Sequence, residues 1–108
     1  MNKIPNDDTG NAIREIISTG VDLTKRMNID FFIEVPDKKF GEQIIRELIE
    51  KGFKTNLDYD KEYESWTCYC TKNTFLEYTN IVTIEKYLEK VASKNFGKLD
   101  GFATYGNL

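Results

Sequence analysis

The chain has 108 residues, of which 40% are hydrophobic, 13% aromatic and 31% charged. This length fits a single domain over residues 1–108, and the composition excludes a disordered chain. The N-terminus lacks the apolar stretch of a secretory signal, and no later run approaches the ~20 apolar residues of a membrane span, so we expect a cytoplasmic protein.

The first predicted elements are a helix and a strand. The helix covers about residues 9–19, with Asp8 or Thr9 as its N-cap, and Gly20 ends it. Residues 27–35 then alternate apolar and polar side chains, which is the period of a half-buried strand.

A second helix and two more strands follow. Asp37 caps the helix, which stops at Gly52. Residues 53–57 and 65–71 read as strands, and an acidic stretch joins them as a hairpin.

The last part of the chain predicts a turn, a third helix and a final strand. The turn lies at about residues 72–74, and Thr79 or Asn80 caps the helix, which ends before Gly97. The strand covers residues 99–105.

This order of elements predicts an α+β fold of the ferredoxin-like, split βαβ type (βαββαβ), preceded by an extra N-terminal helix. The antiparallel sheet carries two helices on one face, so we expect the opposite face to be partly bare. Cys68 and Cys70 lie two apart on a strand and read as small core residues, because a disulfide between them would be strained.

Several kinds of chemistry are missing from the sequence. The chain has no histidine, which excludes imidazole-based catalysis and histidine metal sites, and it has neither of the two common phosphate-binding loops. Asp58, Asp60 and Glu62 resemble the start of a calcium loop, but the required glycine and closing glutamate are absent. We therefore expect no enzyme activity, no metal and no cofactor.

RNA binding is an alternative, because RNA-recognition modules share this topology and stack bases on aromatic residues of the open sheet face. Phe32, Tyr69 and Tyr105 are the candidates here. The basic-glycine-aromatic motif of such modules is absent and the chain is acidic, so we expect no direct nucleic-acid binding. A row of lysines on the third helix is interleaved with glutamates and reads as a solvated face: Lys86, Lys90 and Lys94.

The net charge of −3 is concentrated in one place. Residues 58–64 hold four acids and one lysine, whereas the rest of the chain has 14 acids and 14 bases. Carboxylates mixed with tyrosines suit a basic protein partner, although a charged hairpin can also serve solubility alone. The candidate partner-binding residues are Asp58, Tyr59, Asp60, Glu62, Tyr63 and Glu64; the neighbouring Trp66 is expected to face the core.

The sequence resembles the ribonuclease E inhibitor (RraB) family. The similarity extends over nearly the whole chain and rests on short motifs: Gly20-Val-Asp22, Ile29-Asp-Phe-Phe-Ile33, Glu50-Lys-Gly-Phe53, Glu64-Ser-Trp66 and Leu99-Asp-Gly-Phe-Ala-Thr104. The last is the most specific and supplies the family signature Asp100, Gly101, Phe102 and Thr104.

The resemblance implies a ferredoxin-like protein that binds an endoribonuclease and inhibits or modulates it without catalysis. An alternative from charge alone is an immunity protein or antitoxin that neutralises a basic nuclease toxin. The signature also has a structural interpretation, in which Gly101 permits a bulge or close packing, Phe102 fills the core and Asp100 pairs locally with backbone.

Overall fold

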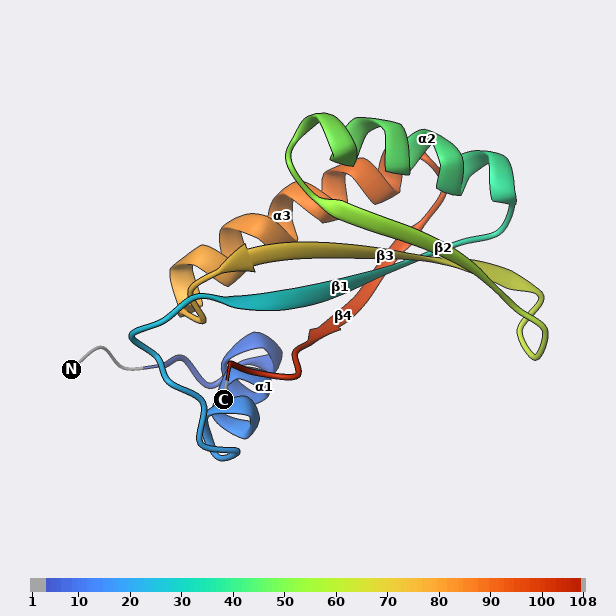
Figure 1. Ribbon diagram of the computed structural model, residues 1–108. Helices are drawn as coiled ribbons and strands as arrows, with labels where there is room; N and C mark the ends of the chain where they lie inside the picture. Colours follow the sequence, from blue (N-terminus) through green and yellow to red (C-terminus); the bar gives the residue numbers. More distant parts are fainter. Residues whose placement is uncertain (1–3, 108) are drawn as a thin grey trace.

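The computed structural model describes residues 4–107 and consists of one four-stranded sheet and three helices (Figure 1). All neighbouring strands are antiparallel, in the order β2-β3-β1-β4, which is the order of a ferredoxin-like sheet and confirms the predicted fold class. The elements along the chain are α1 (Asp8–Ile17), β1 (Met27–Val35), α2 (Lys38–Glu50), β2 (Lys54–Asp60), β3 (Ser65–Thr74), α3 (Tyr78–Lys94) and β4 (Lys98–Ala103).

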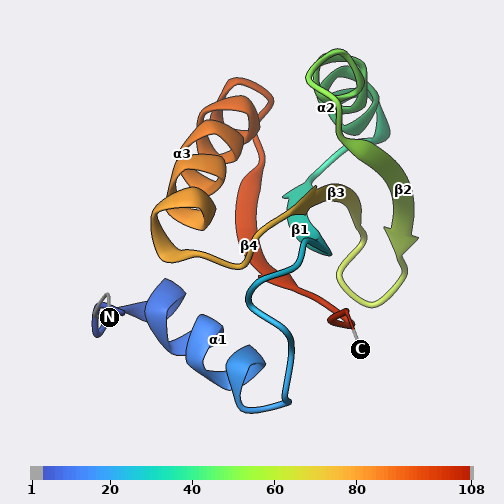
Figure 2. The ribbon, with the colours of Figure 1, turned by 60° about the vertical axis from the view of Figure 1, so that its left-hand side comes forward.

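Helices α2 and α3 cover one face of the sheet (Figure 2). Helix α1 is not part of this layer and packs against α3. The core lies between the sheet and the two covering helices. Strand β1 supplies its centre, because every second side chain of this strand is at most 1% exposed: Met27, Ile29, Phe31, Ile33 and Val35. No helix of the described part of the chain, residues 4–107, covers the other face of the sheet, as expected.

The N-caps show which parts of the helix prediction were right. Asp37 caps α2 as predicted, and its side chain accepts a hydrogen bond from the Lys39 amide. The predicted caps of α1 and α3 were wrong, because Asp7 and Glu77 accept the amide hydrogen bonds at those two helix starts. A glutamate is an unusual N-cap, which is why the pattern favoured the residues that follow it.

Strands β2 and β3 are longer than predicted. β2 continues through Asp60, so the first three residues of the acidic stretch belong to the strand. β3 continues through Thr74, and the predicted turn at residues 72–74 was wrong because Lys72, Asn73 and Thr74 pair with the start of β1. The last strand is shorter than predicted and ends at Ala103.

Cys68 and Cys70 are free, fully buried thiols on the core side of β3, in agreement with the prediction that they are core residues. Burial raises the pKa of Cys68 to about 11 and that of Cys70 to about 12. Both thiols therefore stay protonated at neutral pH. None of the helices among residues 4–107 is long and apolar enough to cross a membrane.

Candidate functional site

The candidate site is the face of the sheet that the helices leave uncovered, called the open face below. Strand alternation points most of the polar side chains of the four strands to this face. Five carboxylates lie on it or at its β4 edge, against two lysines, Lys54 and Lys98. The carboxylates are Asp30, Glu34, Asp58, Asp60 and Asp100.

Two aromatic rings lie at the centre of the open face. Phe32 of β1 and Tyr69 of β3 are directly opposite in the strand register, and their rings pack edge to face with centroids 5.5 Å apart. A hollow of about 490 Å³ lies over them, and Asp30 and Asp58 are among its walls. The centre of this face therefore combines apolar ring surface with negative charge.

The hairpin between β2 and β3 adds acids at one end of the open face. Asp58 and Asp60 extend along β2 on this face, and the Asp60 carboxylate accepts hydrogen bonds from the amides of Glu62 and Tyr63 at 2.9 and 3.3 Å. These bonds shape the tip of the hairpin. Glu64 closes the tip in the left-handed region, with φ of 51°.

The structure does not bring all six predicted hairpin residues to one surface. Tyr59 points to the helix side of the sheet, where its ring packs against Trp66 at 5.2 Å. Trp66 is half-buried on the core side, as predicted. The three tip residues Glu62, Tyr63 and Glu64 are exposed.

The family-signature residues lie at the β4 edge. Asp100 is the extra residue of a β-bulge, because Phe32 pairs with Gly101 whereas the next residue, Ile33, pairs with Leu99. Gly101 has φ of 154° and open space beside it, so it serves the bulge and not close packing.

The other two signature residues fix the end of the chain. Phe102 packs against the buried Phe31 at 5.8 Å, as the structural interpretation expects. The Thr104 hydroxyl donates to the Asn28 carbonyl at 2.6 Å and accepts from the Gly106 amide at 3.0 Å. Both residues have structural roles.

Asp100 interacts with a second carboxyl group and not with backbone. Although Asp100 as a whole is exposed, partial desolvation of its carboxyl group, a hydrogen bond with Glu34 and the negative charge of Glu34 raise its pKa. Glu34 also accepts a hydrogen bond from the Ser65 hydroxyl at 2.9 Å. This pair of carboxyl groups concentrates negative charge at one corner of the open face.

Asp30 and Glu34 are the acids that the sequence analysis missed as site residues. Their signal was present, because they occupy the polar positions of the β1 alternation. Their proximity to the hairpin acids depends on the pairing of β1 with β3, which residue spacing does not reveal.

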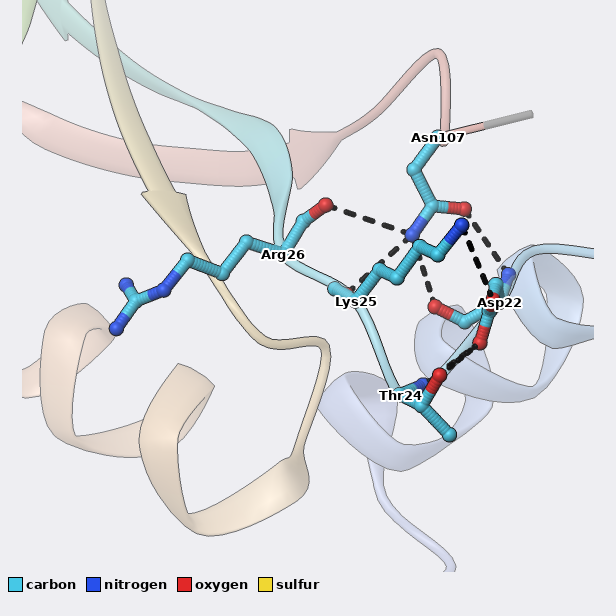
Figure 3. Close-up of polar contacts among 5 residues, drawn as sticks. All are labelled: Asp22, Thr24, Lys25, Arg26 and Asn107. Carbon is cyan, nitrogen blue, oxygen red and sulfur yellow. Dashed lines mark hydrogen bonds and ion pairs between the residues drawn. The ribbon is translucent and has the colours of Figure 1, made fainter.

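The segment after β4 is tied to the loop that follows α1 (Figure 3). The Asn107 amide group donates to the carbonyls of Asp22, Lys25 and Arg26 at 2.8, 3.3 and 3.4 Å, and its oxygen accepts from the Asp22 amide at 2.9 Å. The Asp22 carboxylate in turn binds the amide and hydroxyl of Thr24. The motif at residues 20–22 is thus joined to the segment that directly follows the motif at residues 99–104.

Three other features from the sequence analysis can be located in the structure. No group of three or more His, Cys, Asp or Glu side chains among residues 4–107 is arranged to hold a metal ion. Lys94, from the lysine row of α3, pairs with Glu47 of α2 at 3.2 Å. Phe32, Tyr69 and the fully exposed Tyr105 lie together around the hollow of the open face.

Comparison with models of protein families gives a match over nearly the whole chain. The family model described as "Regulator of ribonuclease activity B" matches residues 6–104, which includes every strand and helix of the structure. No protein in the curated collection of sequences matches the chain.

Proposed function

The chain belongs to the family of regulators of ribonuclease activity B, and we propose that it binds an endoribonuclease and lowers its activity without performing chemistry itself. The observation that carries this proposal is the open face, where, among residues 4–107, five carboxylates and two lysines surround a half-buried aromatic pair. A ribonuclease must attract RNA phosphates and therefore has basic surfaces. An acidic face with aromatic contact area is complementary to such a surface.

The hairpin extends this binding surface beyond the sheet. Asp58 and Asp60 continue the acidic open face, and Glu62 and Glu64 carry the charge to the tip. Tyr63 is 71% exposed, so its ring has area left to bury in a complex, whereas Tyr59 points to the helix side of the sheet and lies outside this surface. In this proposal the carboxylates raise the rate of association with the ribonuclease, and the aromatic rings lower the rate of dissociation.

The proposal is tested by measuring RNA cleavage by a purified endoribonuclease from the same host, with increasing amounts of the chain. The test variant reverses two charges of the open face, Asp58→Lys with Asp60→Lys. We expect at least about tenfold weaker inhibition, because close charge pairs across an interface contribute more than 1 kcal/mol each. Inhibition by the wild-type chain should also fall with added salt.

The matched control reverses two exposed glutamates on α2, Glu42→Lys with Glu50→Lys, which lie on the helix side of the sheet. Its net charge equals that of the test variant, so a general effect of charge would weaken both equally. Equal inhibition by all three proteins would refute the open face as the binding surface. A wild-type chain that binds no endoribonuclease of its host would refute the function.

A further inference from the structure

A second feature is formed by residues at the β3 end of the hairpin and by the turn between α3 and β4. These two segments and the end of β1 enclose a cleft of about 380 Å³ that is open to solvent. Tyr63 and Glu64 line it from the hairpin, Phe96 and Lys98 line it from the α3–β4 turn, and Glu34 lines it from β1.

The backbone is strained on both sides of this cleft. Among residues 4–107, the only non-glycine residues with positive φ are Glu64, at 51°, and Phe96, at 58°. Left-handed conformations are costly for residues with a Cβ atom, and they concentrate at functional sites. Both of them line the same cleft.

Phe96 occupies the position at a helix end where glycine is normal. The Gly97 amide donates to the Ala92 carbonyl at 2.8 Å and the Phe96 amide to the Ser93 carbonyl at 3.4 Å, which makes Phe96 the left-handed residue of a Schellman motif. Its side chain is nevertheless 73% exposed and touches the Phe40 ring on one side. A bulky ring that strains the backbone and is left in solvent contributes little to folding.

The charge of the cleft is negative. Glu34 and Glu64 line it, and Asp100 is hydrogen-bonded to Glu34 directly beside it, whereas Lys98 is its one basic residue. The Glu34 and Asp100 carboxyl groups repel each other when both are ionised. A cation in the cleft would relieve that repulsion.

We propose that this cleft binds an arginine side chain from a basic segment of the partner ribonuclease. The inference rests on the proposed function and adds the chemistry of the contact. A guanidinium group is planar, stacks on aromatic rings and donates to carboxylates in pairs, which matches the two exposed rings and the glutamates of the cleft. A lysine ammonium group has the same charge but cannot stack in this way.

The direct test is an NMR titration of the full-length ¹⁵N-labelled chain with two capped peptides, acetyl-Gly-Ser-Arg-Ser-Gly-amide and the same peptide with lysine in place of arginine. We expect saturable shifts centred on the amides of Glu64, Phe96 and Gly97 with the arginine peptide. The lysine peptide should bind about three- to fivefold more weakly, which is the contribution of one exposed cation–π contact.

Two variants remove the binding groups without straining the fold. Phe96→Asn and Glu64→Gly both place a residue that tolerates the left-handed conformation where a costly one stands now. Each variant should bind the arginine peptide at least about threefold more weakly than the wild-type chain does, since each removes one ring or one carboxylate of the cleft. The matched control is Ile49→Gln, which removes an exposed apolar side chain from α2 and should leave the titration unchanged.

Shifts spread evenly over the acidic surface, equal affinity for the two peptides, or unchanged binding to Phe96→Asn would each overturn the proposal. The same variants in the cleavage assay separate this proposal from the proposed function. If Phe96→Asn inhibits the ribonuclease as well as the wild-type chain does while reversal at Asp58 and Asp60 weakens inhibition, the cleft proposal fails and the proposed function stands.

Discussion

At the end of α3, Phe96 occupies the left-handed position that glycine usually takes, and Gly97 is the residue after it. This arrangement leads to a prediction about stability. The glycine is not in the left-handed position, yet it has no room for a side chain. A Cβ atom on Gly97 would lie 2.8 Å from Val35 Cγ1 and 2.9 Å from the Glu34 carbonyl oxygen. We predict that Phe96→Gly is nearly neutral and that Gly97→Ala is destabilising.

The magnitudes follow from the structure. Phe96→Gly relieves about 1–2 kcal/mol of left-handed strain. It loses about 0.5–1.5 kcal/mol of contact with Phe40, whose ring centroid lies 4.9 Å away, and about 0.5–1 kcal/mol through the greater freedom of glycine in the unfolded chain. These contributions leave a net change between a gain of about 1 kcal/mol and a loss of about 1.5 kcal/mol. Gly97→Ala should cost about 1–3 kcal/mol, because the new methyl group presses on a central strand whose backbone cannot move freely.

Urea unfolding followed by circular dichroism measures both changes as shifts of the midpoint at constant slope. Circular dichroism of the native proteins serves as the control that both variants keep the fold. A loss of more than about 2 kcal/mol in Phe96→Gly would show that the ring is a structural anchor and would contradict this reasoning. So would a fully stable Gly97→Ala.

Two further predictions concern buried thiols and the chain end. Burial raises the pKa of the Cys68 thiol to about 11 and that of the Cys70 thiol to about 12, so the folded protein keeps protons that the unfolded chain releases. The free energy of unfolding is therefore unaffected by these thiols below about pH 9 and falls as the pH rises through 11. Between pH 8 and pH 10 the two thiols together lower it by about 2–3 kcal/mol. Urea titrations at the two pH values should show this loss, and the variant with Cys68→Ala and Cys70→Ala should lack it; an identical pH dependence in that variant would count against the assignment. Asn107→Ala removes the four hydrogen bonds that tie the chain end to residues 22–26 and should lower the free energy of unfolding by about 1–2 kcal/mol, whereas an unchanged midpoint would mean that these bonds only replace bonds to water.

Much of the fold could be predicted from local sequence. The alternation of residues 27–35 gave β1 with the bounds that the structure shows, and Asp37 and Gly52 marked the two ends of α2. Gly52 is the left-handed residue of the Schellman motif there, with φ of 85°. These features are local, because strand period and helix capping depend on neighbours within a few residues.

The start of α1, which was predicted one residue too late, and the glycine after the end of α3 both involve distant contacts. α1 begins one residue early because Asp7 accepts hydrogen bonds both from the Gly10 amide and from the Tyr78 hydroxyl of α3. At the end of α3, Gly97 looked like the usual helix-stopping glycine, but it is needed for the close approach to β1. Gly97 therefore marked the end of α3 in the sequence, but the contact that requires a glycine there is visible only in the tertiary structure.

For the candidate site, the sequence alone determined that the chain is acidic, that residues 58–64 concentrate that charge and that histidine chemistry is absent. Only the tertiary structure decided which side each residue faces, since it separated Tyr59 from Asp58 and Asp60 and brought Asp30 and Glu34 beside them. The physical reason is that side-chain direction within a strand follows a local period of two, whereas the neighbours across a sheet are set by strand pairing over long separations and by a bulge at Asp100.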